Sequence, residues 1–397
     1  MRFRDALRAP GLGAIAEVKR RSPSAGDLRP EADPAKLAAA FERAGAAAIS
    51  ILVDARFGGR IEDLRAARAA TSLPLLAKGF FHEAADLAPL REAGADAVLV
   101  LLSDLDDPAA TRLVSAARDL GMEALVEAHD PTELDRAVAL GAGVIGINAR
   151  DLSTFRIDRD AQLELVSRAP ADRVIVAESG IGNRAHALLA EASGADAVLV
   201  GTTLMRAADP GLALDDLLAR PLVKVCGLTR EEDVAAAADA GADMAGFVLS
   251  PSPRRVEAPL PVPDGLLSVA VVVGEDPAPP ADLVQRYGRE EDGHRSREAA
   301  LFRRRREVAR VADLPWEGED PAHLERASAI VGRLMLAGGL SADNVGAAIR
   351  RVRPWAVDAS RSLEAVPGRK DPALVHAFVR AAREALRREP EREEAMG

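Results

Sequence analysis

The chain of 397 residues has one cysteine, Cys226, so no disulfide can form within it, which fits a reducing compartment. No uninterrupted apolar run reaches about 18 residues, the length that a membrane-spanning helix needs. The N-terminal stretch MRFRDALRAPGLG has no apolar core of a signal peptide. These absences predict a cytoplasmic protein with no membrane partner.

Metal and dinucleotide motifs are missing as well. Six histidines are scattered without metal-ligand spacing, and there is no G-x-G-x-x-G turn. The chain has 62 acidic and 52 basic residues, a formal charge of −10, which argues against a nucleic-acid partner. We therefore expect neither a metal nor a cofactor.

Lysine is nearly absent. Only five of the 52 basic residues are lysines, namely Lys19, Lys36, Lys78, Lys224 and Lys370. Arginine serves wherever any cation will do, whereas lysine alone offers a compact ammonium whose pKa its surroundings can tune. The positions that keep a lysine are therefore candidates for chemistry.

Apolar sequence is abundant and follows a repeating order. Hydrophobic residues make up 48% of the chain, and its length predicts two domains. Eight apolar runs each precede an Ala/Leu/Arg-rich helical segment in the first half: residues 13–19, 46–53, 74–79, 95–102, 122–129, 142–149, 173–179 and 195–202. Such runs are typical of buried parallel strands, and eight βα units favour a closed (β/α)₈ barrel over a doubly wound open sheet.

The pattern restarts after residue 218. Strand candidates are residues 222–229, 244–250, 266–274, 282–287, 298–302, 306–313, 333–339 and 355–360. The stretch 275–330 is poor in apolar residues and rich in charge, so 282–287 and 298–302 are the weakest of these. The sequence predicts an α/β fold of two consecutive (β/α)₈ TIM barrels, in domains 1–218 and 219–397, the second smaller and divergent in its middle strands.

Charged and amide side chains end the strands of the first half, where a barrel forms its catalytic mouth. Glu17 and Lys19 lie two apart, so both point into this mouth. The full set is Glu17, Lys19, Lys78, Glu127, Asn148, Arg150 and Glu178. An ordinary salt bridge would explain any one of them, but a dense cluster in a pocket shifts pKa values and suits acid–base catalysis.

Small residues end the last two strands of this half, at Ser179-Gly180 and Gly201-Thr202. Barrels build phosphate sites there from backbone N–H groups, and Ser22 after the first strand adds a hydroxyl donor. Ordinary turns would explain the same residues. The residues alone thus predict an enzyme that acts on a phosphorylated small molecule by acid–base chemistry.

The motifs of the first half resemble indole-3-glycerol-phosphate synthase over about residues 1–207. They are residues 15–24 (IAEVKRRSPS), Lys78, 125–129 (LVEAH), 145–152 (IGINARDL) and 177–181 (AESGI). The resemblance implies a barrel that closes the pyrrole ring of 1-(o-carboxyphenylamino)-1-deoxyribulose 5-phosphate and then releases CO₂ and water.

The same resemblance implies roles for these residues. Lys78 is the general acid for ring closure, Glu127 transfers protons, and Lys19 pairs with the substrate carboxylate. Residues that bind hydroxyls or orient the lysines are Glu17, Asn148, Glu178 and Ser179, with Arg150 also in the substrate site. The residues implied to bind the phosphate are Ser22, Gly180, Gly201 and Thr202. Burial and a neighbouring cation are expected to lower the pKa of the catalytic lysine.

Two features depart from this family. An extra helical segment usually precedes its first strand, whereas here the first strand begins near residue 13. Either this sequence starts late, or the lid is reduced and the substrate affinity is lower. The usual Arg-Lys-Asp-Phe of the third strand reads Ala77-Lys78-Gly79-Phe80. We expect this loss of charged neighbours to alter the pKa of the acid without abolishing the reaction.

The second half resembles phosphoribosylanthranilate isomerase. The motifs are residues 223–229 (VKVCGLT), 246–247 with 252–255 (SPRR), 336–340 (LAGGL) and 353–358 (RPWAVD). The resemblance implies an Amadori rearrangement of N-(5-phosphoribosyl)anthranilate, with Cys226 as general base and Asp313 as general acid. Arg255 would bind the anthranilate carboxylate, and the phosphate end comprises Gly338, Gly339, Asp358 and Ser360.

The middle strands of this half diverge from that family, because the sequence reads Gln285-Arg286-Tyr287-Gly288 where the family has Gln-Leu-His-Gly. We therefore expect a bifunctional enzyme of tryptophan biosynthesis. The alternative is an active synthase barrel beside an isomerase-like barrel that is inactive or altered. Weaker alternatives are a regulatory protein on an inactive barrel and a different phosphosugar isomerase.

Overall fold

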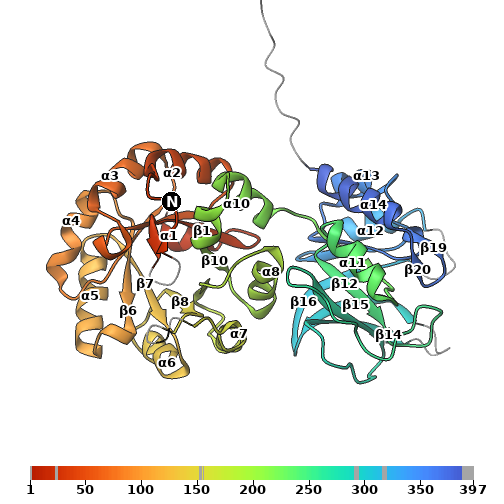
Figure 1. Ribbon diagram of the computed structural model, residues 1–397. Coiled ribbons are helices and arrows are strands. Elements are labelled where there is room, and N and C mark those ends of the chain that lie inside the picture. The colour runs from red at the N-terminus through yellow and green to blue at the C-terminus, as the bar shows by residue number, and fades with distance from the viewer. Residues whose placement is uncertain are drawn as a thin grey trace, which may run out of the picture. The chain divides into compact units, whose positions relative to one another are not determined.

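The computed structural model of the chain describes residues 2–22, 26–151, 154, 156–289, 295–314 and 320–386. The chain forms two compact units, Met1–Leu218 and Ala219–Gly397 (Figure 1). Each unit contains one closed barrel of eight strands. The prediction of two consecutive barrels is therefore confirmed.

The first unit closes its eight strands in chain order, all parallel. They are β1 (Gly13–Val18), β4 (Ala48–Leu52), β5 (Leu75–Lys78), β6 (Ala97–Leu101), β7 (Glu123–Ala128), β8 (Val144–Asn148), β9 (Val174–Glu178) and β10 (Ala197–Val200). Each apolar run of the first half contains one of these strands. A two-stranded hairpin of β2 (Arg21–Ser22) and β3 (Gly26–Asp27) follows β1.

Helices surround this barrel (Figure 1). They are α1 (Phe3–Leu7), α2 (Pro34–Arg43), α3 (Ile61–Ala70), α4 (Leu87–Glu92), α5 (Asp107–Asp119), α6 (Pro131–Ala139), α7 (Arg159–Arg168), α8 (Arg184–Ser193), α9 (Thr202–Arg206) and α10 (Pro210–Leu218). Short 3₁₀ turns are η1 (Ala55–Phe57), η2 (Ala84–Asp86) and η3 (Leu102–Asp104). Several helices start at an aspartate followed by proline. The carboxylates of Asp33 and Asp130 accept backbone N–H groups of the first turns of α2 and α6.

A repeated Gly-Ala-Asp sequence leads into several strands. Gly94 and Gly194 end helical segments with φ of 104° and 119°, a conformation that favours glycine. The carboxylate of Asp96 accepts the backbone N–H of Leu75 at 3.0 Å, and that of Asp196 accepts the N–H of Ile175 at 2.8 Å. The aspartate therefore ties the start of its own strand to that of the neighbouring strand.

Helix α1 packs against the amino-terminal end of the first barrel. Phe3 and Leu7 belong to the same buried cluster as inward-facing side chains such as Ile15 and Leu125. The backbone N–H of Arg4 donates to Glu123, the first residue of β7, at 2.8 Å. The helix therefore lies at the end opposite the mouth formed by the carboxyl ends of the strands.

The second unit closes its barrel with strands of mixed direction. They are β11 (Leu222–Cys226), β12 (Met244–Val248), β13 (Leu267–Val273), β14 (Leu283–Arg289), β15 (Arg295–Arg303), β16 (Arg306–Ala312), β17 (Leu334–Leu336) and β18 (Ala356–Ala359). Its helices are α11 (Glu231–Asp239), α12 (His323–Ser328), α13 (Val345–Val352) and α14 (Pro372–Glu384), with η4 (Arg361–Leu363) and the hairpin β19 (Glu364–Val366) and β20 (Arg369–Lys370).

The weakly supported runs 282–287 and 298–302 are indeed strands, but the βα alternation expected here is wrong. Strand β15 pairs antiparallel with both β14 and β16. Only Arg304 and Arg305 separate β15 from β16, which suffices for a hairpin, whereas a parallel crossover needs about a dozen residues or more. Seven strands thus remain parallel, and the middle of this barrel is divergent as predicted.

No helix in the described ranges is long and apolar enough to cross a membrane. The same ranges contain no group of three or more His, Cys, Asp or Glu side chains that could hold a metal ion.

We expect Phe3→Ala to destabilise the first barrel by about 3–5 kcal/mol, because the ring is buried in the barrel core and its loss leaves a cavity. Urea unfolding of the full chain measures the change, with the activity of the first unit as the signal that is monitored. Leu212→Ala, at a leucine that is 68% exposed, is the control and should shift the transition little. Equal effects of the two variants would contradict the role of α1.

Candidate active site

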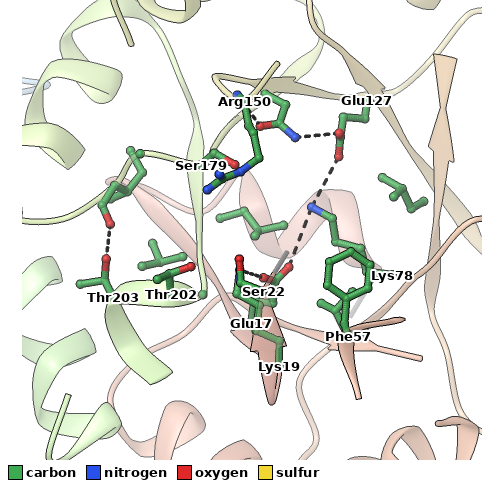
Figure 2. A pocket seen from close by; sticks show the side chains of 18 of the residues that line it. Glu17, Lys19, Ser22, Phe57, Lys78, Glu127, Arg150, Ser179, Thr202 and Thr203 are labelled. Atoms are coloured by element: carbon green, nitrogen blue, oxygen red, sulfur yellow. Dashed lines mark hydrogen bonds and ion pairs between the residues drawn. The ribbon is translucent and has the colours of Figure 1, made fainter. Parts of the chain in front are cut away.

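A cavity of about 800 Å³ opens at the carboxyl ends of the first barrel's strands. Figure 2 shows side chains from separate strands pointing into it. Among the residues that line it are most of those predicted from the sequence: Glu17, Lys19, Ser22, Lys78, Glu127, Asn148, Arg150, Ser179, Gly180, Gly201 and Thr202. Glu178 does not line the cavity but contacts Lys78 directly. The structure thus brings all the predicted residues of the first half to one place.

Lys78 lies at the centre of this site, surrounded by carboxylates from three other strands. Its Nζ donates to Glu178 Oε2, and it lies 3.5 Å from Glu127 Oε2 and 3.9 Å from Glu17 Oε2. The side chains come from β5, β9, β7 and β1, which are alternate strands of the barrel. Alternate strands supply the side chains of one layer in such barrels, so this layer consists of one lysine and three glutamates.

Two glycines make room for this layer, Gly146 on β8 and Gly201 directly after β10. A Cβ atom on Gly146 would come within 2.0 Å of Glu178 Oε1, and one on Gly201 would come within 2.4 Å of Glu17 Oε1. Contacts that short do not occur between real atoms, so the two positions accept only glycine while the glutamates keep their orientation.

The carboxylate of Glu127 contacts three side chains: Asn148, His129 and Lys78. Asn148 Nδ2 donates to its Oε1 at 2.8 Å, and His129 Nε2 lies 3.3 Å from the same oxygen. His129 Nδ1 in turn lies 3.0 Å from Glu133 Oε2, whose oxygen also accepts the backbone N–H of His129. The carboxylate of Glu127 is therefore fixed on one side and faces Lys78 on the other.

The charges of this cluster follow from burial and proximity. Burial opposes the charge of Lys78, but Glu178, Glu127 and Glu17 outweigh it and raise the pKa of the ammonium well above its usual value. Burial also opposes the charge of Glu127, yet Lys78, His129 and Asn148 hold its pKa well below the usual range. For Glu178, burial raises the pKa to about 8, and Glu127 adds to this effect against the pull of Lys78.

The expectation of a lowered lysine pKa is therefore wrong. A neighbouring cation would lower the pKa, but the groups that face Lys78 are three carboxylates. The free site holds Lys78 as an ammonium and keeps a proton on Glu178 near neutral pH. Lys19 lies at the side of this cluster, 2.7 Å from Glu17 Oε1, and together with Lys78 it lowers the pKa of Glu17 against the effect of burial.

The other end of the cavity is lined by small residues and backbone. Ser179 and Gly180 adopt positive φ values of 64° and 71°, which turns the chain sharply after β9. Thr203 Oγ1 donates to the carbonyl of Ile181 at 2.7 Å and joins this turn to the start of α9. The backbone N–H groups of these turns suit a phosphate.

Several cavity residues were not among the predicted site residues, and Arg56, Phe57 and Phe80 stand out among them. Phe57 and Phe80 stack with ring centroids 6.3 Å apart, and the Arg56 guanidinium lies 3.8 Å above the Phe80 ring. Arg56 and Phe57 lie in η1, in the loop after β4, and Phe80 lies two residues beyond β5, so their place in loops at the strand ends was the available signal. Their flat apolar wall suits an aromatic substrate.

The second unit has a smaller buried cluster at the carboxyl ends of β11 and β18. Lys224 Nζ donates to Asp358 Oδ2 at 2.9 Å, and both side chains are buried. Burial raises the pKa of the Cys226 thiol, while the neighbouring Lys224 ammonium lowers it. Cys226 therefore rests as a thiol beside a cation that stabilises its thiolate. Asp358, expected at the phosphate end, instead pairs with Lys224 inside the barrel.

Arg254, rather than Arg255, packs against Gly227, the residue after Cys226. Arg255 is exposed and donates to the carbonyl of Leu249, whereas Arg254 is buried and binds Glu364 through two hydrogen bonds of 2.7 and 2.6 Å. The buried arginine is thus one position before the one expected to bind a carboxylate, because the chain turns at residues 252–255.

Asp313, the expected acid, lies just beyond β16. Its Oδ2 accepts the hydroxyl of Tyr287 at 2.8 Å, and its Oδ1 accepts the backbone N–H of Leu314 at 2.8 Å. Gly338 packs so closely on Leu314 that a Cβ would lie 2.6 Å from its nitrogen. Residues 315–319, which follow Leu314, lie outside the described residues. Gly339 also has a positive φ, and the carbonyl of Ser360 accepts Lys370 Nζ at 3.0 Å.

Comparisons with known proteins match both units. Residues 1–217 match the family model of indole-3-glycerol phosphate synthase, and residues 322–381 match that of N-(5'-phosphoribosyl)anthranilate (PRA) isomerase. The indole-3-glycerol phosphate synthase of Mycobacterium ulcerans (strain Agy99) is 48% identical over 214 residues, 54% of this chain and 79% of that relative. The chain belongs to the indole-3-glycerol phosphate synthase family.

Two further similar proteins are a second synthase and a solved structure. The indole-3-glycerol phosphate synthase of Mycobacterium avium (strain 104) is 46% identical over 54% of this chain and 79% of its own length. A crystal structure of TrpF from Jonesia denitrificans aligns at 26% identity and a TM-score of 0.32, over 42% of this chain and 98% of that one. The chain joins a lyase and an isomerase family of tryptophan biosynthesis, as predicted. We call Met1–Leu218 the synthase barrel and Ala219–Gly397 the isomerase unit.

Gly146→Ala should lower kcat/KM of the synthase barrel about a hundredfold, because the new methyl group displaces Glu178 and with it Lys78. Gly143→Ala, just before the same strand, is the matched control, since its Cβ would meet its nearest neighbour at 3.4 Å. Steady-state kinetics with circular dichroism as the folding check measure both. Full activity in Gly146→Ala would show that the orientation of Glu178 does not matter.

His129 should make the synthase barrel lose stability as the pH rises. Burial opposes its charge, but Glu127 and Glu133 raise its pKa from 6.5 to about 10. The folded state therefore holds the proton more tightly, so this stabilisation is complete below pH 6.5 and disappears as the pH rises through 10.

Urea unfolding at a series of pH values compares the wild type with His129→Gln. The variant should be less stable than the wild type, and this difference should be larger at pH 6.5 than at pH 10. His82→Gln, at a histidine whose side chain is 56% exposed, controls for the substitution itself. A difference between wild type and His129→Gln that does not vary with pH would contradict the assignment.

Proposed function

We propose that the synthase barrel converts 1-(o-carboxyphenylamino)-1-deoxyribulose 5-phosphate to indole-3-glycerol phosphate, and that the isomerase unit makes this substrate from N-(5-phosphoribosyl)anthranilate. The observation that carries the proposal is the Lys78 ammonium, buried at the wall of a cavity that has an aromatic wall and a phosphate-binding end. Family membership supplies the reaction, and the residue roles below are inferences from geometry.

Ring closure needs an acid at the ketone. Lys78 gives a proton to the ketone oxygen while the ring carbon that bears the carboxylate forms the new bond to the ketone carbon. That carboxylate leaves as CO₂, and its electron pair restores the aromatic ring. Lys19 lies next to Glu17 at the cavity and pairs with the carboxylate before it leaves. General acid catalysis of this kind contributes about 10²–10⁴-fold.

Dehydration completes the indole. The hydroxyl left by ring closure departs as water with a proton from Lys19 or Lys78, and a base removes a proton from the carbon next to the nitrogen. Glu127 suits this step because Asn148 and His129 hold it as a carboxylate. Ser22, Arg150, Ser179, Gly180, Gly201 and Thr202 line the remainder of the cavity and bind the sugar hydroxyls and the phosphate.

In the isomerase unit the acid and base lie on opposite sides of the barrel. Asp313 protonates the furanose ring oxygen, which opens the ring. Cys226, with Lys224 next to it, then removes the proton from carbon C2 of the sugar. Arg254, Gly338, Gly339 and Ser360 bind the charged ends of the substrate. The product is the substrate of the synthase barrel.

A synthase whose isomerase unit is inactive is the second candidate. Two observations favour it: Glu364 engages Arg254 through both of its oxygens, and β15 runs opposite to its neighbours. A substrate carboxylate would have to displace Glu364 in order to reach Arg254.

A coupled assay on the full chain tests both activities. N-(5-phosphoribosyl)anthranilate, generated in place, should disappear and indole-3-glycerol phosphate should form. Lys78→Ala should lower synthase turnover about 10²–10⁴-fold and leave the isomerase step intact, whereas Cys226→Ala should do the reverse. Each variant is thus the control for the other. Turnover of only the added ribulose intermediate would establish the second candidate.

A further inference from the structure

A chain of hydrogen bonds crosses the interior of the isomerase unit and ends at Asp313. Gln285 Nε2 donates to the hydroxyl of Tyr287 at 2.8 Å, and that hydroxyl donates to Asp313 Oδ2 at 2.8 Å. Gln285 and Tyr287 both lie on β14 and are buried, at 0% and 4% exposure. Tyr287 is the single tyrosine of the chain.

The reversed strand explains how Tyr287 reaches so far. It lies on β14, whereas Asp313 follows β16, so the side chain must cross β15. The residue of β15 directly opposite Tyr287 is Ala299, whose own partner on β16 is Val311. Opposite residues point to the same face of a sheet, and a methyl group at Ala299 leaves the ring room to lie across it.

Both oxygens of Asp313 are thereby oriented. Tyr287 holds Oδ2 and the backbone N–H of Leu314 holds Oδ1, which fixes the plane of the carboxyl group.

We propose that Tyr287 is a positioning residue for Asp313 in the isomerase reaction: it reaches across β15 and orients the carboxyl group. This role rests on the proposed isomerase function. Gln285 supports it, because its amide donor occupies a lone pair of the hydroxyl and directs the tyrosine proton toward Asp313.

Other titratable groups share this end of the barrel. Asp358 on β18 interacts with Asp313 and is paired with Lys224 on β11, while Cys226 and Lys370 lie near that pair. Asp358 and Tyr287 therefore both act on Asp313, and substitution of each separates their effects.

Tyr287→Phe in the full chain separates positioning from packing, because it removes only the hydroxyl. We expect isomerase kcat to fall about tenfold or more with little change in KM, since one hydrogen bond to a charged group is lost. Turnover of added 1-(o-carboxyphenylamino)-1-deoxyribulose 5-phosphate by the synthase barrel should not change, which shows that the chain is folded. An unchanged isomerase kcat, or a raised KM with kcat unchanged, would overturn the proposal.

A second measurement does not depend on isomerase activity. Incorporation of 3-fluorotyrosine gives the chain a single ¹⁹F resonance, because Tyr287 is its only tyrosine. This resonance should move in Asp313→Asn, which replaces the carboxylate that accepts the tyrosine hydroxyl, and should move less in Asp358→Asn. A resonance that does not respond to Asp313→Asn would overturn the proposal even if the isomerase is active. If the resonance responds but the chain has no isomerase turnover, the proposed function has failed, and the hydrogen bond is structural only.

Discussion

The synthase barrel depends on the burial of one ammonium among three carboxylates. Lys78, Glu17, Glu127 and Glu178 are all nearly inaccessible to solvent, and charges in such a place are tolerated only when they are paired. The pairing requires a closed barrel, because the four side chains come from β1, β5, β7 and β9. It also requires glycine at Gly146 on an intervening strand, where any side chain would occupy the space of Glu178.

The same layer explains how the site can hold acid and base together. Three carboxylates face one ammonium at the centre, so they cannot all be ionised at low cost, and the proton remains on Glu178, the most deeply buried of them. Glu127 stays ionised because Asn148 and His129 add donors that Glu178 lacks on its side chain. Environment alone thus separates residues of one type into a proton holder and a carboxylate base.

The isomerase unit shows how much of a barrel can change around a buried cluster. Strands β11 and β18 carry Cys226, Lys224 and Asp358, and they keep their parallel pairing. The part that differs is the antiparallel run β14–β16, which lies on another side of the same closed sheet. Asp313 follows the last of these strands, and Tyr287 joins it to the first. The altered segment therefore supplies both the expected acid and the residue that holds it.

The sequence by itself determined the positions of the strands, because near-continuous apolar runs and Gly-Ala-Asp turns are local signals. It also determined which residues of the first barrel meet, since the carboxyl ends of parallel strands converge. Only the tertiary structure decided the strand direction in the isomerase unit and the burial of Arg254 in place of Arg255. The same is true of the partner of Asp358 and of the raised pKa of Lys78. Each depends on which groups from distant parts of the chain face one another, and no local pattern records that.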